Sequence, residues 1–405
     1  MTLPTPEEAR TLLPELQELR RAIHREPELG LDLPRTQQKV LDALAGLDLE
    51  IIPGKALTSL TVVLRGGKRP AEGAKAVLLR GDMDALPVKE ATGFEFSSEN
   101  DNMHACGHDL HTAGLVGAVK LLHGVRDELP GDVVFMFQPG EEGQNGAGTM
   151  IEEGVLEAAG VPVVAAYGVH VSGDNELGHL FTRPGTWMSA ASMMRVTVKG
   201  KGGHGSRPHT GKDPIHAGAA MVTGLQEYIT RRFDLFDPVV ATVGKFHGGT
   251  AVNIIPDFAV LDITVRTFSN GTTERVANEL PEFMKNMART YGLEADVEFT
   301  VGLPATINDE AETEYFLDTH RTLFGEERTH LAPNPKSGSE DFSRILARVP
   351  GTYGHIGVTM PGLDPAEQDS NHSPRAKHSD EALSDQALFL ATLAHGRLAK
   401  EVTGR

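Results

Sequence analysis

The first half of the chain alternates short apolar runs with stretches of helical periodicity, and this alternation limits the fold more than any other feature. Such alternation is typical of an α/β domain with a largely parallel sheet. In open sheets of this kind, ligands bind beyond the carboxyl ends of the strands. The runs that lead into polar residues are AKAVLLR before Asp82, DVVFMFQPG before Glu141 and Glu142, PVVAAYGVHV around His170, and GTYGHIGV before NHSP at 371–374. We therefore expect these polar residues to gather at one edge of a sheet.

The middle of the chain follows a different order. Residues 187–300 read as strand, helix, two strands, helix and strand, which is the order of the split βαβ or ferredoxin-like arrangement. A segment of about 100 residues can close a core of its own, and 405 residues are too many for most single cores. We expect a larger α/β domain from residues 1–186 and 301–405, with a mostly parallel central sheet, and an inserted second domain at 187–300.

Charge and composition exclude several classes of partner. The formal net charge of −18 leaves no basic face for nucleic acid. No apolar span approaches the ~20 residues of a membrane helix, and the N-terminal residues lack the basic and apolar segments of a signal peptide. The single cysteine excludes an intrachain disulfide and favours a reducing, cytoplasmic location. We expect neither a nucleic-acid nor a membrane partner.

The stretch NMHACGHDLHT, residues 102–112, contains that cysteine between histidines. On a helix Cys106 and His108 would point to nearly opposite faces, whereas on an extended segment they point the same way. They therefore converge only if the helix begins after them, and Asp109 is a suitable N-cap for it. Read alone, Cys106 is a small buried apolar residue, a thiol nucleophile activated by a neighbouring histidine, or a metal ligand.

Two pairs of carboxylates follow apolar runs. In FQPGEEG, the bend at 139–140 can turn Glu141 and Glu142 to different tasks, although a solvated acidic turn is the alternative. In the first case Glu142 binds metal and Glu141 holds the attacking water as general base. In RGDMDALP, either Asp82 or Asp84 touches a metal, orients a metal-bound histidine from behind, or only turns the chain after the strand.

Taken singly, His170 and His372 are compatible with structural roles. Together with Cys106, His108 and Glu142 they make a set of potential ligands at strand ends. These donors exceed one closed tetrahedral site and suit two divalent metal ions. Their mixture of sulfur, nitrogen and oxygen admits Mn(II), Zn(II), Co(II) or Ni(II), of which we expect Mn(II) or Zn(II).

Polar residues of the insertion form a second group of candidates. Glycines surround His204 in VKGKGGHGSRPHTG and permit close backbone approach to a ligand, although a flexible hairpin with a solvated histidine is the alternative. Asn253 and Arg266 add an amide and a guanidinium that can hold a carbonyl and a carboxylate, while Arg266 also suits an ordinary exposed strand. His24 is expected to pack at the end of the first helix, and Glu340 receives no role.

The motifs together resemble a known family. The chain carries, in this order, LRGDMDALP, MHACGHDLHTA, FQPGEEG, GVH, GKGGHGSRPH, NIIPD, VRTF, GSEDF and HSP. It resembles the amidohydrolase branch of the dinuclear-metal aminoacylase and carboxypeptidase family, which includes hippurate hydrolase and indoleacetyl-amino-acid hydrolase. The resemblance covers nearly the whole chain. It departs at Gly140, at Gly205 and Ser206, and in the absence of a proline soon after His170, and no departure removes a ligand or the base.

The resemblance implies a two-domain hydrolase whose larger domain carries the metals. It implies that the inserted domain dimerises and acts as a lid, so that the enzyme is a homodimer. It also implies that the metal ligands are Cys106, His108, Glu142, His170 and His372.

The remaining candidates take their roles from the same resemblance. Glu141 is the general base, Asp84 orients the metal site from behind, and Asp82 occupies a position where related branches use a metal-binding histidine. His204 reaches the site of the partner subunit to stabilise the oxyanion. The substrate carboxylate is positioned by Asn253 and Arg266.

The expected activity is metal-dependent hydrolysis of the amide bond of small-molecule N-acyl amino acids, with acetyl, benzoyl or other acyl groups. The products are a carboxylic acid and an amino acid. A dipeptidase, carboxypeptidase or small-molecule deacetylase on the same scaffold is the nearer alternative. The more distant alternative is a non-hydrolytic binding protein, and the presence of Glu141 argues against it.

Overall fold

The computed structural model describes residues 3–403, and in it the chain divides into two compact units. The second unit contains Thr186–Thr306 and the short segment Pro335–Ser343, and the first unit contains the rest. Residues 335–343 lie outside the segment that the sequence set apart as an insertion. The chain therefore passes between the units four times.

The first unit is built on an eight-stranded sheet with the strand order β1-β2-β4-β3-β5-β16-β6-β15. The pairs β4-β3, β3-β5, β5-β16 and β6-β15 are parallel, and the other neighbours are antiparallel. The strands of the sheet are β1 (Glu50–Pro53), β2 (Leu60–Leu64), β3 (Ala76–Asp82), β4 (Asp132–Gln138), β5 (Val163–Ser172), β6 (Leu180–Thr182), β15 (Thr329–Leu331) and β16 (Gly351–Gly357).

The sheet is mixed, which corrects the prediction of a mostly parallel sheet. The connection between β1 and β2 is a short turn closed by a hydrogen bond from Gly54 N to Ser59 O at 2.9 Å. A parallel pair needs a crossover of a dozen or more residues, so this connection forces an antiparallel hairpin at one edge. The centre of the sheet, from β4 through β3 and β5 to β16, is parallel as expected for an α/β fold.

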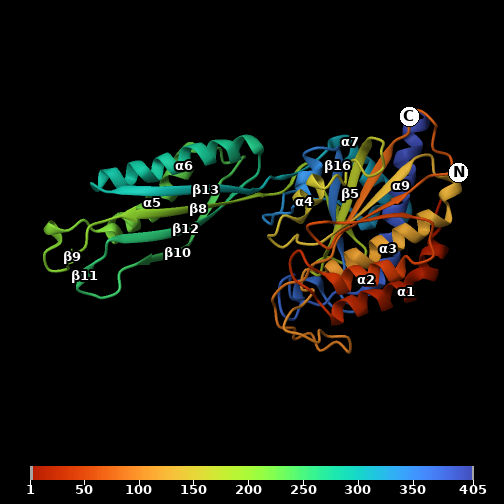
Figure 1. Cartoon of the computed structure of the whole chain (residues 1–405), viewed down its shortest axis with the longest axis horizontal. Helices are drawn as coiled ribbons and strands as arrows, with labels where there is room; N and C mark the ends of the chain where they lie inside the picture. The colour runs from red at the N-terminus through yellow and green to blue at the C-terminus, as the bar shows by residue number, and fades with distance from the viewer. Residues whose placement is uncertain (1–2, 404–405) are drawn as a thin grey trace. The chain divides into compact units, whose positions relative to one another are not determined.

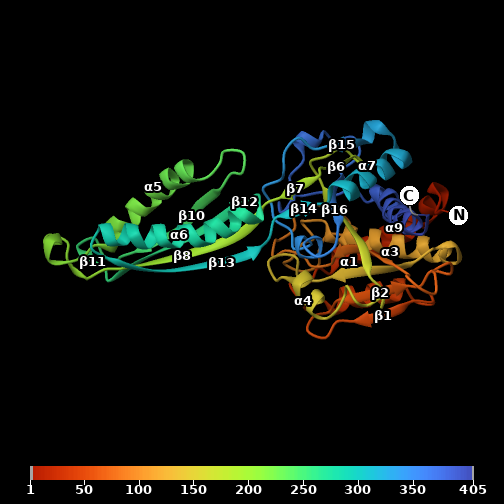
Figure 2. The ribbon, with the colours of Figure 1, turned by 90° about the horizontal axis from the view of Figure 1, so that it is seen from above.

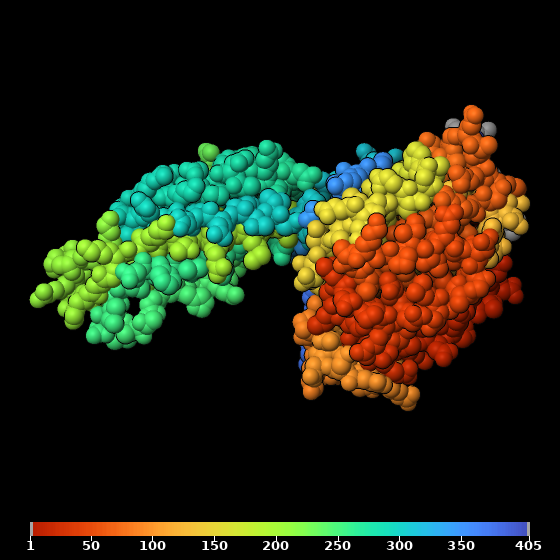
Figure 3. Space-filling view, viewed as in Figure 1, coloured from red at the N-terminus to blue at the C-terminus, as the bar shows by residue number. Residues whose placement is uncertain are grey.

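Helices α3 and α9 pack against each other and against β3, and α1 packs on both helices (Figures 1 and 2). Their apolar side chains form one core with the sheet. The N-terminal segment, red to orange in Figure 3, covers much of the face of this unit seen there. The α-helices outside the four-stranded sheet unit are α1 (Pro6–Arg25), α2 (Pro34–Ala43), α3 (His108–Gly124), α4 (Gly146–Glu152), α7 (Glu310–Phe324), α8 (Ser343–Leu346) and α9 (Leu383–Thr403).

Helix α3 begins directly at the predicted ligand His108. Gly107 precedes it with φ +86°, a left-handed conformation that glycine adopts readily. Asp109 does not cap the helix, which corrects our prediction. Its carboxylate is fully buried and lies 2.7 Å from Arg20 Nε and 2.8 Å from His24 Nδ1, both on α1. The ion pair ties α1 to the start of α3, and His24 packs near the end of α1 as predicted.

The second unit is a four-stranded antiparallel sheet with the order β10-β12-β8-β13. Residues on β8 alternate between buried and more exposed because only one face of the sheet is covered, by α5 and α6 (Figures 1 and 2). The main elements are β8 (Ala190–Lys199), α5 (Pro214–Arg232), β10 (Val240–Gly248), β12 (Phe258–Thr267), α6 (Asn270–Thr290) and β13 (Glu294–Leu303). Their order along the chain is that predicted.

Short strands complete the two units. A two-stranded sheet pairs β9 with β11 inside the second unit. No helix among residues 3–403 is long and apolar enough to span a membrane. The remaining strands are β7 (Gly185–Met188), β9 (Gly203–His204), β11 (Ile254–Ile255) and β14 (Thr306–Asn308).

Candidate metal centre

All five predicted ligands come together in the first unit. Their ligand atoms form two sets that share the thiol, one set being Cys106, His108 and His170, and the other Cys106, Glu142 and His372. Within each set the ligand atoms lie within 4.8 Å of one another. Cys106 lies in the loop before α3, and His108 is the first residue of α3. Glu142 follows β4, His170 lies near the end of β5, and His372 lies in the loop after β16. Cys106 thus lies among the other predicted ligands, and its role as a metal ligand stays a prediction.

The thiol lies at the centre of the group. Cys106 Sγ is 3.3 Å from His170 Nε2 and 3.2 Å from His372 Nε2. His372 Nε2 is also 3.2 Å from Glu142 Oε1. With Zn–S and Zn–N bonds of about 2.3 and 2.0 Å, two donors of one tetrahedral zinc ion lie roughly 3.5 Å apart. The observed separations are therefore close to those of atoms that share a metal ion.

Two of the imidazoles are oriented by backbone carbonyls. His108 Nδ1 lies 2.9 Å from Asp84 O, and His170 Nδ1 lies 2.6 Å from Val171 O. A carbonyl oxygen accepts hydrogen bonds only, so Nδ1 of each ring carries the proton. In a neutral ring Nε2 is then the atom that can bind metal, which is the usual arrangement of metal-binding histidines.

Asp84 shapes the turn that carries the two glutamates. Its carboxylate oxygens accept hydrogen bonds from Glu141 N and Glu142 N, each at 3.0 Å. Glu141, Glu142 and His108 present ligand atoms within 4.8 Å of one another. The turn thus brings both carboxylates to the ligand group, and the predicted division of labour between base and ligand is sterically available.

A buried pair next to the ligands was missed in the sequence. Asp82 binds Arg80 at 2.6 Å and His111 Nδ1, and His111 Nε2 accepts a hydrogen bond from Val171 N at 2.8 Å. Both ring nitrogens of His111 therefore have partners, and Asp82, His108 and His111 also present ligand atoms within 4.8 Å of one another. The signal was available, because HDLH places His108 and His111 three residues apart on one face of α3.

Burial and neighbouring charges shift the pKa values of Asp82, His170 and His372. Burial opposes the ionisation of Asp82, but Arg80 and His108 outweigh it and hold the pKa of that carboxyl well below its usual range. Burial, together with His111 and His108, lowers the pKa of His170 far enough to keep the ring neutral. Contacts with Cys106 and Glu142 raise the pKa of His372 to about 10, so metal binding at this ring displaces a proton.

The donor set fits divalent metal ions. Nε2 of His108 is buried and has no hydrogen-bond partner among the described residues, so it is available to bind a metal ion. Thiolate, imidazole and carboxylate together suit Zn(II) and its first-row neighbours better than Mg(II) or Ca(II), which prefer oxygen donors.

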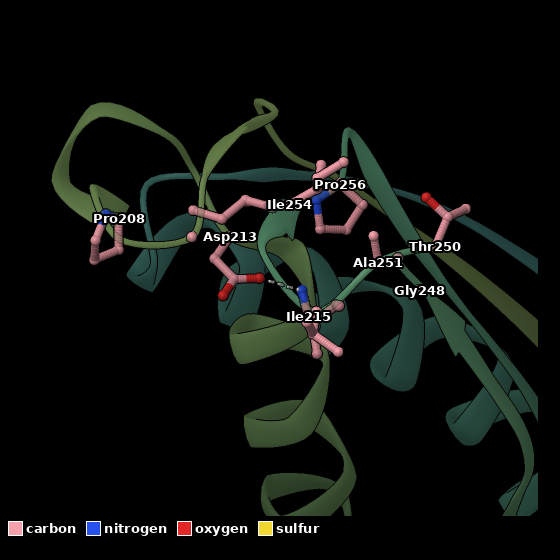
Figure 4. A pocket seen from close by; sticks show the side chains of 12 residues that line it. Pro208, Asp213, Ile215, Gly248, Thr250, Ala251, Ile254 and Pro256 are labelled. Carbon is pink, nitrogen blue, oxygen red and sulfur yellow. Dashed lines mark hydrogen bonds between the residues drawn. The ribbon is translucent and has the colours of Figure 1, made fainter.

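The other three predicted site residues belong to the second unit. His204 on β9 faces Ile254 on β11, and Gly205 N donates to Asn253 O at 2.8 Å, so His204 and Asn253 lie on adjacent segments. An open hollow beside them is drawn in Figure 4, where Asp213 caps α5 by accepting from Ile215 N.

Arg266 stands apart on β12 of the same unit. Its guanidinium is half-buried, and its Nη1 donates to Ser339 Oγ at 3.4 Å. Glu340, for which we predicted no role, is buried and accepts a hydrogen bond from Phe342 N at 3.0 Å. The roles of His204, Asn253 and Arg266 at the metal centre stay predictions.

Comparison with known proteins decides the relationship. Residues 78–395 match the model of peptidase family M20/M25/M40. The chain belongs to this family. Across 381 residues it is 34% identical to the IAA-amino acid hydrolase ILR1-like 4 of Arabidopsis thaliana, covering 93% of this chain and 84% of that protein. The N-acetyl-L-cysteine deacetylase of Bacillus subtilis is also 34% identical, over 86% of this chain and 81% of its own.

Other relatives of this M20 family member are named as peptidases. The thermostable carboxypeptidase 1 of Saccharolobus solfataricus is 33% identical, over 96% of this chain and 95% of its own. A crystal structure of the Bacillus subtilis YXEP protein, described as a dinuclear metal-binding peptidase of the M20 family, superposes with a TM-score of 0.82. It is 28% identical and covers 96% of this chain and 99% of its own. The family resemblance read from the motifs is confirmed, and the chain is a hydrolase of the metal-dependent amidohydrolase type.

Proposed function

We propose that this M20 family member hydrolyses the amide bond of N-acyl amino acids. The observation that carries the proposal is the convergence of a thiol, three imidazoles and Glu142 beside Glu141, on a turn held by Asp84. The relatives named as IAA-amino acid hydrolase and N-acetyl-L-cysteine deacetylase support an acyl group joined to an amino acid as the substrate.

The cofactor that we infer is a pair of divalent metal ions. Mn(II) or Zn(II) is the first expectation, with Co(II) or Ni(II) as alternatives, because the donors mix sulfur, nitrogen and oxygen. The neighbouring structure described as a dinuclear metal-binding peptidase supports a pair. Such ions, when bound, polarise a substrate carbonyl and lower the pKa of water. A free thiol among the ligands supports a reducing, cytoplasmic location. The residues that would hold the ions are Cys106, His108, Glu142, His170 and His372.

The proton transfers fall to Glu141. Its carboxylate takes a proton from the attacking water and delivers it to the leaving nitrogen when the amide bond breaks. Asp84 fixes the position of this residue through the Glu141 backbone N–H, and it fixes Glu142 through the next one. One aspartate thus sets the spacing between the base and a metal ligand.

The second unit would complete the substrate site. We propose that it dimerises the enzyme and closes as a lid, as the family resemblance implies. His204 serves the active site of a second subunit and donates to the oxyanion, while Asn253 and Arg266 hold the substrate carboxylate. The exposed position of His204 supports a role outside its own unit.

Replacing His204 with alanine tests this assignment. We expect kcat to fall about 100- to 1000-fold with little change in KM, because an oxyanion donor acts mainly in the transition state. Steady-state kinetics on the best substrate measures both constants. The matched control is His247→Ala, an exposed histidine of the same unit. An unchanged kcat in His204→Ala removes the proposed role.

A substrate panel tests the activity itself. Purified protein is assayed for metal content and for hydrolysis of N-acetyl, N-benzoyl and indoleacetyl amino acids and of simple dipeptides, before and after chelation. We expect hydrolysis of at least one N-acyl amino acid, loss of activity on chelation, and recovery with Mn(II) or Zn(II). Activity that survives complete metal removal contradicts the proposal.

The same substrate panel distinguishes hydrolysis of N-acyl amino acids from peptide cleavage. The relative named as a carboxypeptidase makes peptide cleavage on this scaffold the second candidate. Preference for dipeptides over every N-acyl amino acid would assign the chain to that class. A protein loaded with metal that cleaves no amide in the panel would instead support a non-hydrolytic binding role.

A further inference from the structure

Asn371 precedes the predicted ligand His372 in the chain. Its side chain contacts the backbone of Cys106 and of Val171, which follows His170. We propose that Asn371, supported by His378, is a positioning residue that fixes His170 and His372 around Cys106. The inference rests on the proposed function, because it assigns the support of the same metal centre. Neither residue belongs to the five ligands.

The side-chain amide of Asn371 uses its full bonding capacity. Its Nδ2 donates to Cys106 O at 3.2 Å and to Val171 O at 3.0 Å, and it lies 4.0 Å from Cys106 Sγ. Its Oδ1 accepts from His378 Nε2 at 3.1 Å and, more weakly, from Gly173 N at 3.4 Å. An asparagine has two donors and two acceptor sites, so every site has a partner. The two carbonyls also fix which end of the amide is nitrogen.

Val171 O is the point where this amide acts on an imidazole. The same carbonyl accepts from His170 Nδ1 and from Asn371 Nδ2. Because the carbonyl sets which nitrogen of His170 is free for metal, an amide that holds the carbonyl also holds the ring. The second hydrogen bond of Asn371 Nδ2, to Cys106 O, connects the segment that carries the thiol to the same side-chain amide.

His378 supports the amide from the opposite side. The ring is buried, and burial lowers its pKa to about 3, so it is neutral and donates from Nε2 to Asn371 Oδ1. It lies against two glycines. A β-carbon at Gly107 would come within 3.4 Å of His378 Nδ1, and one at Gly173 would come within 3.4 Å of His378 Cδ2. The ring is therefore close to the backbone of the thiol segment and to the backbone that follows β5.

His372 needs such support because its backbone is unfavourable. It is one of two described non-glycine residues with positive φ, at +73°, and its side chain is half-exposed on a loop. Left-handed backbone is disfavoured for residues with a β-carbon and persists where surrounding bonds impose it. His372 N donates to Ala105 O at 2.9 Å, so this residue and its neighbour Asn371 both anchor the loop to the segment of the thiol.

Metal affinity of Asn371→Leu tests the inference. Leucine keeps the approximate volume but makes none of the hydrogen bonds, and we expect Zn(II) affinity, measured by competition with a chelator, to fall 10- to 100-fold. His378→Leu should produce a smaller fall in the same direction, and His378→Gln, which keeps an N–H donor, should recover most of it. Thermal unfolding of each metal-free variant establishes that the chain is folded.

Gln368→Leu is the matched control. Gln368 braces the same loop through Gly173 O, Lys377 O and Met360 N, but it contacts none of the ligand residues. We expect its Zn(II) affinity to stay within threefold of the wild type. Equal losses in Asn371→Leu and Gln368→Leu would reduce the effect to general loosening of the loop and overturn the inference.

The only cysteine of the chain provides a readout that is independent of catalysis. In excess Zn(II), alkylation of Cys106 by iodoacetamide should be slow in the wild type and at least tenfold faster in Asn371→Leu. Wild-type affinity and wild-type protection in Asn371→Leu would overturn the inference and leave the proposed function standing. A wild-type protein that binds no Zn(II) or Mn(II) would overturn both.

Discussion

Glu141→Gln should lower kcat about 100- to 10,000-fold while leaving the metal content unchanged. The amide cannot take a proton from water, and general acid–base catalysis by one residue contributes a factor of this size. The backbone N–H of residue 141 is retained, so its hydrogen bond to Asp84 is preserved and the turn should keep its shape. The measurements are steady-state kinetics on the best N-acyl amino acid and metal content by elemental analysis.

The control is Glu152→Gln on α4, an exposed glutamate near the end of that helix. It makes the same change of charge outside the ligand group and should behave like the wild type. A Glu141→Gln protein that loses metal along with activity would make Glu141 a ligand. A protein that keeps both would leave the reaction without its proposed base.

Cys106→Ser should abolish tight metal binding while the chain stays folded. A serine hydroxyl stays protonated near neutral pH and is a poor substitute for a thiolate shared by two ligand sets. Replacing a residue that hydrogen-bonds to a metal ligand typically lowers metal affinity 10- to 100-fold. Loss of a ligand itself should therefore lower it at least about 100-fold. The site is buried and serine is slightly smaller, so the metal-free melting temperature should move little.

Competition with a chelator gives the affinity, and thermal unfolding gives the stability of the metal-free forms. Alkylation of the wild type supplies the control, because metal should slow it and chelation should restore it. Equal alkylation rates with and without metal would make Cys106 a packed residue near a site that does not use it. A variant that binds metal normally would have the same meaning.

The convergence of Glu142 and His170 could be predicted from the sequence because both belong to apolar runs and because parallel strands end at one edge. Glu142 after β4 and His170 in β5 illustrate this, since β4, β3 and β5 are parallel neighbours. The order of elements in the second unit was equally readable, because its strands alternate buried and exposed residues and its helices are bounded by turns. These features could be predicted because they depend on residues that are close together in the sequence.

The sequence did not predict side-chain contacts between residues that are far apart in the chain. Asp109 has the chemistry of an N-cap, but its carboxylate forms a buried ion pair with Arg20 on α1, and Gly107 occupies the N-cap position. The spacing in HDLH places His111 on the same face of α3 as His108, but its pairing with Asp82 depends on the packing of α3 against β3. Asn371 was not predicted, because its contacts are with Cys106 and Val171, which are distant in the sequence.

The ligand group is spread along the chain, and this sets a schedule for its assembly during translation. His372 follows Cys106 by 266 residues. At 5–20 residues per second, roughly 10–50 s pass between the synthesis of the thiol and that of its last imidazole partner. Helix α9, which completes the core of the first unit, is made later still. In the metal centre that we propose, the last ligand is made long after the thiol, and we expect metal loading only after His372 has been synthesised.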